Sequence, residues 1–409
     1  MINLKTKRIV GIIKGVTVLL LVFFGELFAQ TSSHEKLEAD DVTHLEKTPS
    51  KAMSPDSHDS FTHPTLNFGT SLPTDVGRGY PTGFGFFSWK KSAWPWISSD
   101  FKFIFAGISG DAELIFRGLI ASDTHFGLGL NYQTLGRFEE YQRGQIAIEN
   151  RMETNKVTGR LFLEQSIIAE YAEIAKIRLI YEFGYEDYSR DDDTAPAFIL
   201  APSGTFQSMK LNGNTGHLNR PLYSPSGWNL NLTFEAVFRN HWHRWGPPNL
   251  WDSPSEFQKM QLNTSYVFSS FYEQKMIAKL NGGIGNGLDR LSAYKIGGSL
   301  AGIFDPLVLH GFYAQEIFAE DYGLLNLDYV FPLLKEQEMA LHLYLDSAVT
   351  QRSDILDHQA HGWIGVGSGV SLKGWLDSQW LFGYGYGINA QRKSDHGGHE
   401  VFAQMTKSF

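Results

Sequence analysis

The sequence predicts an all-β fold: a transmembrane antiparallel β-barrel of about sixteen strands. Three observations support this fold class. Apolar and polar residues alternate with a period of two from about residue 80, aromatic residues make up 14% of the chain, and the N-terminus carries an export signal. The mean hydropathy is only -0.22, which suits a barrel because its strands need an apolar residue only at every second position.

Residues 1–29 are predicted to be a secretory signal peptide. Basic residues precede the apolar run at 16–24, and Ala29 marks a cleavage point just before Gln30. The run is shorter than the ~20 apolar residues of a spanning helix, so we expect cleavage rather than a retained membrane anchor. The chain has no cysteine, which excludes disulfides, cysteine-bound metals, thiol catalysis and a lipid-modified N-terminal cysteine.

The mature chain is expected to consist of a leader and one barrel domain. Residues 30–79 are polar and rich in Ser, Asp, Glu, His and Pro, a composition that predicts a disordered periplasmic leader. Residues 80–409 are expected to form the barrel, in the outer membrane of a Gram-negative-type bacterium and in contact with outer-membrane lipids. The formal net charge of -9 argues against nucleic acid as a partner.

The stretch WNLNLTFEAVFR, residues 228–239, shows the alternation clearly. Its apolar face consists of Trp228, Leu230, Leu232, Phe234, Ala236 and Phe238. A helix would scatter these residues around its axis, whereas a soluble β-sandwich would alternate in the same way. The aromatic apolar faces and the terminal strand VFAQMTKSF favour the membrane barrel. We take Phe409 as the C-terminal barrel signal, although Lys407 interrupts the apolar face before it.

The strands are expected near residues 82–91, 100–108, 111–121, 125–134, 140–149, 157–168, 177–188, 205–218, 227–239, 258–270, 274–284, 322–332, 338–348, 362–373, 377–388 and 400–409. With this order the short links fall on one rim. Most of the longer links, including 285–321, fall on the other, as in bacterial barrels. The seam is expected between the first strand, near Gly83, and the last, near Phe409.

Several motifs in the second half of the chain follow one another in a fixed order. They are HLNRPLYSPSGW, GGIGNGLDRLSAYKIGG, VLHGF, YLDSA and GVGSGVSLKGW. In this order they resemble the BamA/TamA superfamily of outer-membrane assembly and secretion barrels. The resemblance covers residues 205–409 well, whereas residues 80–204 share only the general character of the strands. Because a polar leader stands where the superfamily carries periplasmic substrate-binding repeats, it implies a barrel-only member.

The resemblance also implies that the long sixth outer loop, residues 285–321, is folded into the lumen and forms a latch inside the barrel. In the superfamily an arginine at the loop tip pairs with acidic wall residues, and His310 holds that position here. The alternation independently places Asp346 on the lumen side of its strand. We expect His310 near Asp346, in a latch that is weaker and more sensitive to acid, because arginine could make a bidentate pair there. The alternative is that His310 caps a solvated loop. The residues assigned are His310, Gly311, Phe312 and Asp346 in the latch, and Gly297 and Gly298 in the loop approach.

Two rows of glycine near the C-terminus form a second constellation. They are Gly365, Gly367 and Gly369, and Gly383, Gly385 and Gly387, each row on one face of its strand. Missing side chains on the inner wall would leave room for another backbone to lie close. The alternative is that these glycines provide curvature near the seam.

No enzyme chemistry is recognised in the chain. It lacks a nucleophile elbow, a strand-then-helix phosphate loop and a pocket for paired carboxylates, so we expect no enzyme, no cofactor and no metal site. Charges of both signs on the polar faces predict a salt-bridged inner wall. They are Arg160, Glu164, Arg178, Glu182, Glu186, Glu235, Arg239 and Asp328.

By the resemblance, the expected function is outer-membrane protein insertion or assembly, or protein translocation. Such a role implies an unfolded client protein or a periplasmic or lipoprotein partner. A passive or gated pore, and a structural or adhesive surface barrel, are alternatives because a fold does not fix a function.

Overall fold

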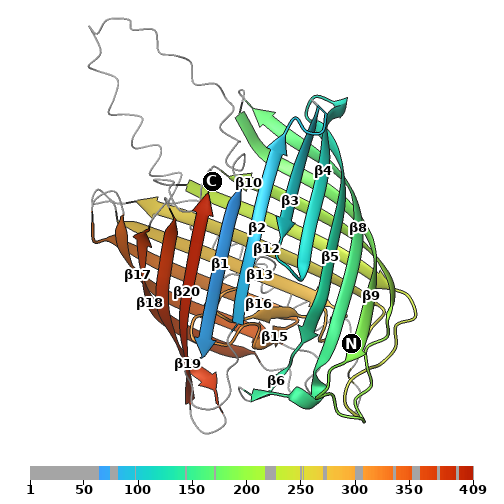
Figure 1. Cartoon of the computed structure of the whole chain (residues 1–409), viewed down its shortest axis with the longest axis vertical. Coiled ribbons are helices and arrows are strands. Elements are labelled where there is room, and N and C mark those ends of the chain that lie inside the picture. Colours follow the sequence, from blue (N-terminus) through green and yellow to red (C-terminus); the bar gives the residue numbers. More distant parts are fainter. Residues whose placement is uncertain are drawn as a thin grey trace, which may run out of the picture. The chain divides into compact units, whose positions relative to one another are not determined.

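The barrel strands are β1 (Thr65–Pro73), β2 (Thr82–Ser92), β3 (Ser99–Phe105), β4 (Ser109–Ala121), β5 (Thr124–Phe138), β8 (Met152–Ala169), β9 (Ala172–Arg190), β10 (Gly204–Gly216), β11 (Gly227–Arg239), β12 (Glu256–Ser269), β13 (Lys275–Asn286), β16 (Asp321–Pro332), β17 (Met339–Gln351), β18 (His361–Lys373), β19 (Gln379–Gln391) and β20 (His396–Ser408). They close into one antiparallel barrel in this order, and β1 pairs with both β2 and β20 (Figure 1). The predicted fold class, an all-β barrel of about sixteen strands, is confirmed.

The structure is a computed structural model. It describes residues 64–73, 82–96, 98–142, 145–169, 172–216, 227–248, 251, 253–269, 274–299, 307–334, 338–351, 360–374, 378–392 and 396–408. The predicted signal peptide, most of the predicted leader and Phe409 lie outside the described residues. No helix in the described ranges is long and apolar enough to cross a membrane.

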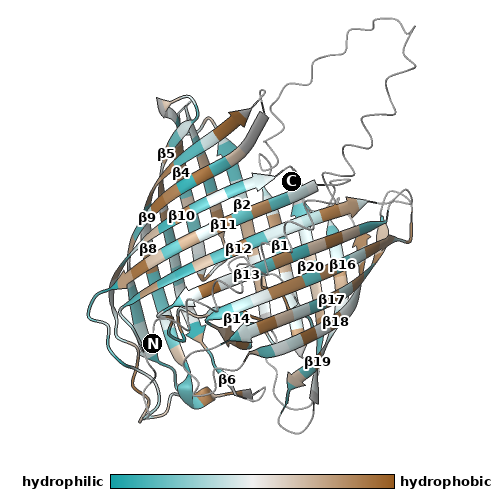
Figure 2. Cartoon of the chain, turned by 180° about the vertical axis from the view of Figure 1, so that it is seen from behind, coloured by the Kyte–Doolittle hydropathy of each residue, from teal (hydrophilic) through white to brown (hydrophobic). Residues whose placement is uncertain are grey.

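The apolar face of each strand points outward, as β17 illustrates. Leu343 and Leu345 are 47% and 48% exposed, whereas His342 and Asp346, on either side of this pair, are 8% and 1% exposed. Figure 2 shows hydrophobic and hydrophilic residues alternating along the strands of the wall. A soluble sandwich would bury the apolar rows, so this arrangement is that of a membrane barrel. Closure also removes both sheet edges, whose unpaired backbone groups would each cost several kcal/mol in hydrocarbon.

Two strand predictions were wrong, and the errors cancel in the count. Residues 65–73 were expected in the leader but form β1, whose outward row Leu66, Phe68 and Leu72 is short and is interrupted by Thr70. The segment 140–149 was expected to be a wall strand, yet it has too few apolar residues for a ~9–11-residue spanning strand. It forms a short hairpin, β6 (Tyr141–Gln142) with β7 (Gln145–Ile146), and then a 3-10 turn, η1 (Ile148–Asn150).

The first strand of the seam is therefore β1, not the strand that contains Gly83, which is β2. It runs between β1 and β20 over nine residue pairs, from Thr65 opposite Ser408 to Pro73 opposite Glu400. Its inner side is tied by a side-chain hydrogen bond of 2.6 Å from the Thr406 hydroxyl to Asn67 Oδ1.

Residues 287–320, between β13 and β16, form the sixth link on their rim, and we call them loop L6. Its two legs run side by side, because β14 (Tyr294–Ile296) pairs with β15 (Ile317–Ala319). Other outer links pack beside L6 in an aromatic cluster. It contains Phe138, Met152, Phe198, Ala201, Trp245 and Phe318. The described outer ends of the barrel are thus an ordered cap with its own apolar core.

Candidate functional site

The tip of L6 is bonded to one carboxylate on β17. The backbone N–H of His310 donates to Asp346 Oδ2 over 2.7 Å, and the ring Nδ1 lies 2.6 Å from the same oxygen. The Asn326 amide donates to Asp346 Oδ1 at 2.8 Å and to the Val308 carbonyl at 2.9 Å. Asp346 and His310 are 1% and 6% exposed. The predicted pair thus lies in contact, and a buried carboxylate is satisfied as burial requires.

Two aromatic rings complete the environment of the histidine. The His310 ring stacks on Tyr344 at 4.2 Å between centroids with planes 11° apart, and lies 5.7 Å from the Phe402 ring. Stacking of this kind adds stabilisation beyond the buried area. His310 therefore does not cap a solvated loop: its described contacts are with inward-facing residues of β17 and β20.

The glycine rows provide the room for this contact. A Cβ on Gly385 would lie 2.6 Å from the Gly311 nitrogen, and one on Gly387 would lie 2.8 Å from the Gly311 carbonyl oxygen. A side chain on Gly365 would collide with the His310 carbonyl oxygen. These positions support the close approach of another backbone, the first of the two alternatives. The remaining glycines, Gly367, Gly369 and Gly383, lie beneath the rings of Tyr344 and Phe402.

Gly311 itself has to be glycine. Its φ is +79°, in the left-handed region that other residues adopt at a cost, and a Cβ there would collide with the backbone of β19. The adjacent Phe312 is buried and meets the Trp363 ring edge-on at 5.9 Å. The tip thus lies directly on the inner side of β18 and β19.

The two approach glycines fold back onto the tip. Gly297 and Gly298 have φ values of +134° and +89°. Their N–H groups donate to the carbonyls of Leu307 and Phe312 at 3.0 and 3.1 Å, and the Leu309 N–H donates to Gly298 at 3.0 Å. All the predicted site residues except Phe409 therefore lie in one described cluster. That the long sixth loop as a whole is folded into the lumen stays a prediction.

The expected salt-bridged inner wall is confirmed. Lys210 lies 2.9 Å from Glu182 and 3.2 Å from Glu235, and Arg178 lies 2.6 Å from Glu164. The other predicted wall charges have partners too: Asp111 for Arg160, Lys156 for Glu186, Asp289 for Arg239 and His342 for Asp328. Within the described ranges no group of three or more histidine, aspartate or glutamate side chains could hold a metal ion.

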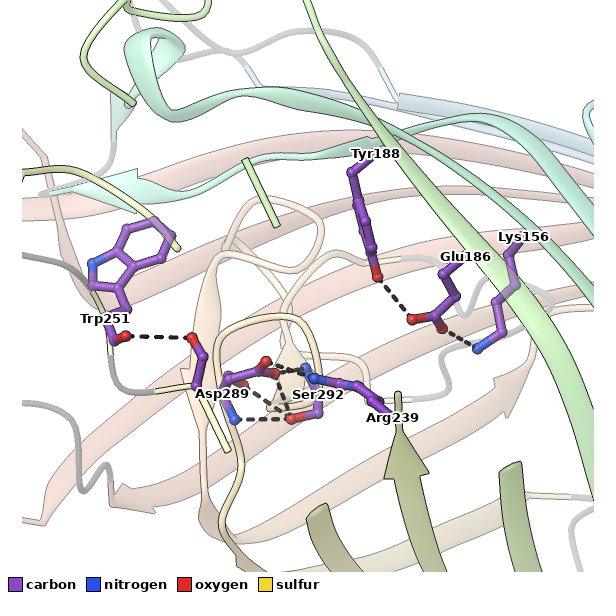
Figure 3. A network of polar contacts seen from close by, with 8 residues as sticks. Lys156, Glu186, Tyr188, Arg239, Trp251, Asp289 and Ser292 are labelled. Atoms are coloured by element: carbon purple, nitrogen blue, oxygen red, sulfur yellow. Dashed lines mark hydrogen bonds and ion pairs between the residues drawn. The ribbon is translucent and has the colours of Figure 1, made fainter. Parts of the chain in front are cut away.

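Sequence reasoning missed the charged partners of L6 itself. Asp289, in the first leg, pairs with Arg239 at the outer end of β11 (Figure 3). Glu316, in the second leg, pairs with Arg392, which follows β19. The hydroxyl of Ser299 is hydrogen-bonded to Glu400, a fully buried carboxylate on β20. These partners are far apart in the sequence, and no local pattern signals them.

Comparison with known proteins adds the fold alone. No protein-family model and no curated protein sequence matches the chain. BamA from Haemophilus ducreyi lacking POTRA domains 1-3 is similar with a TM-score of 0.55 and 11% identity, over 85% of this chain and 70% of that one. CdiB from Acinetobacter baumannii gives 0.58 and 10%, over 85% and 60%. CdiB from Escherichia coli gives 0.59 and 15%, over 90% and 64%.

The chain spans between 60% and 70% of the length of these three proteins. The expected resemblance in fold is confirmed, since BamA and CdiB match 85–90% of this chain with TM-scores of 0.55–0.59. The fold and the apolar exterior place the protein in the outer membrane of a Gram-negative-type bacterium, as predicted.

Proposed function

We propose that this barrel takes part in the insertion or assembly of outer-membrane proteins, or in the translocation of protein across the outer membrane. One observation carries the proposal: the tip of L6 is bonded to the inner side of β17 to β20, the strands that lead to the seam. The likeness in fold to BamA and CdiB supports it. The client would be an unfolded protein.

The seam is the place where such a client could pair. β1 is joined to β20 by nine residue pairs and to β2 by seven, compared with eighteen between β8 and β9. Parting β1 from β20 would break half as many residue pairs as parting β8 from β9, although the pairing of β2 with β3 is shorter still, at six pairs. It would expose two strand edges, and an unpaired edge is a template for strand addition.

The tip of L6 would bias the seam toward closure. Its contacts with Gly385 and Gly387 fix the inner side of β19, and β19 carries β20. Because an unpaired edge is costly in hydrocarbon, opening requires that an incoming strand replace the lost pairs. In this mechanism the protein supplies an open strand edge at the seam, and the client strand supplies the backbone hydrogen bonds that replace the lost β1–β20 pairs.

A seeded folding assay tests the proposal. A second, unrelated barrel is folded from urea into liposomes that contain this protein, and unfolded protein is tested for passage into the liposome interior. We expect faster folding, or protected internal protein, than in empty liposomes. If neither occurs, the proposal fails. Large stable currents in planar bilayers that survive deletion of L6 would instead favour a passive pore.

A further inference from the structure

We propose that L6 is a brace that joins two distant parts of the barrel wall, and that Arg239 and Arg392 are the positioning residues that hold its ends. The two arginines come from the outer end of β11 and from the residue after β19. Each binds a carboxylate on a different leg of the loop, Asp289 before the tip and Glu316 after it. The inference holds whether the barrel inserts, translocates or conducts.

The Arg392 anchor is a buried fork. Its Nη1 lies 2.6 Å from Glu316 Oε1, and both side chains are 8% exposed. Its guanidinium stacks on the Tyr313 ring at 3.9 Å, and its Nη2 lies 3.4 Å from the Gly311 carbonyl oxygen. The other oxygen of Glu316 accepts from the Tyr313 N–H at 2.8 Å. Arginine suits this position because a planar fork can pair, stack and donate at the same time.

The last strand is shaped around this anchor. A Cβ on Gly398 of β20 would collide with both Arg392 Nη2 and the Gly311 carbonyl oxygen. Next to it, buried Glu400 is bonded to Ser299 of the first leg. The strand on one side of the seam therefore contacts L6 both at its tip and ahead of it.

The Arg239 anchor is equally buried. Its Nη1 lies 2.7 Å from Asp289 Oδ2, and the two side chains are 7% and 1% exposed. The guanidinium lies over the Trp242 ring at 4.1 Å and the Phe257 ring at 4.6 Å. Asp289 also accepts from the Ser292 N–H and hydroxyl at 2.9 and 2.7 Å, which fixes a tight turn in the first leg (Figure 3).

The two anchors are separated along the wall. In the ring of sixteen strands β11 is the ninth and β19 the fifteenth, so they stand six positions apart. A buried charge that loses its partner is strongly unfavourable, so neither leg can leave its anchor without leaving a buried charge unpaired. Movement of the last hairpin, β19–β20, should therefore be transmitted through L6 to the β11 side of the wall.

Charge reversal with hydrogen exchange tests the brace on the full folded protein. Arg392→Glu should raise amide exchange in residues 307–313 roughly tenfold or more, and adding Glu316→Arg should restore protection. Arg239→Glu should raise exchange in the adjoining 286–296 segment and also, at a distance, in the outer half of β20. Arg117→Glu is the matched control, because Arg117 pairs with Asp100 at 2.6 Å but is 43% exposed and belongs to β4.

The outcomes separate a brace from independent tethers. An Arg239→Glu effect confined to residues 286–296 would overturn the brace, and so would an Arg392/Glu316 swap that leaves the tip unprotected. Heat-modifiable migration identifies the folded fraction. If a reversal prevents folding, Arg239→Lys and Arg392→Lys keep the charge but lose the fork, and the same remote increase in exchange is expected from Arg239→Lys.

Discussion

Asp346 Oδ2 accepts two hydrogen bonds from His310, one from the backbone N–H at 2.7 Å and one from the ring Nδ1 at 2.6 Å. This pair links the tip of L6 to the middle of β17 on the inner side of the wall. Because the carboxylate is 1% exposed, its desolvation is offset only by the donors that surround it. Asp346 is therefore the wall residue that holds the tip of L6 at β17.

Asp346→Asn is expected to lower the free energy of unfolding by about 1–3 kcal/mol, since the amide keeps one acceptor but loses the charge and presents a donor to buried donors. Urea unfolding in lipid bilayers, followed by tryptophan fluorescence, measures the change. Asp100→Asn removes an equally short pair with half-exposed Arg117 and should cost about 0–1 kcal/mol. Equal losses from the two variants would contradict the role given to Asp346.

Gly311→Ala is expected to destabilise the folded barrel by at least about 1–2 kcal/mol, the cost of a left-handed backbone for a residue with a side chain. The added methyl would also displace the tip from β19. The matched control is Gly323→Ala, where a Cβ would have nothing within 4 Å. If both substitutions leave unfolding and the exchange of the tip amides unchanged, the close packing of tip and wall is wrong.

A disulfide across the seam is expected to block the proposed function without unfolding the barrel. Asn67 and Thr406 face each other on β1 and β20 and their side chains are hydrogen-bonded. The chain has no other cysteine, so Asn67→Cys with Thr406→Cys should form one defined crosslink. Seeded folding should stop in the oxidised form and return on reduction. Undiminished seeding by the oxidised protein would mean that the seam does not open in function.

The stability of L6 should fall in alkali. Tyr294 in the first leg donates to the Met260 carbonyl at 2.9 Å, and burial, the largest cause, raises its pKa above the usual value of ~10. A raised pKa means that the folded protein holds the proton while the unfolded chain loses it near pH ~10. The free energy of unfolding should therefore decline above that pH, and less steeply in Tyr294→Phe. An identical slope in the two proteins would show that Tyr294 does not contribute.

The wall was predictable because a period of two is a local signal. The same alternation predicted that Asp346 faces the lumen. The order of the motifs predicted that His310, at the loop tip, lies near Asp346. β1 was missed because its outward row, Leu66 to Leu72, is short and is diluted by Thr70. The partners of L6 were missed because they are distant in the sequence: Arg392 and Glu316 are 76 residues apart, and Glu400 and Ser299 are 101 apart. Such pairs come together only when the strands close into the barrel, so the local sequence does not predict them.

The central claim is that the apolar rows face lipid around a closed cylinder, and cysteine scanning of β17 tests it most directly. Single cysteines at His342, Leu343, Tyr344 and Leu345 carry a fluorophore, and brominated lipids serve as quenchers. We expect strong quenching at Leu343 and Leu345, which are 47% and 48% exposed, and little at His342 and Tyr344. Uniform quenching, or none at the leucines because they are packed inside a water-soluble protein, would contradict the barrel.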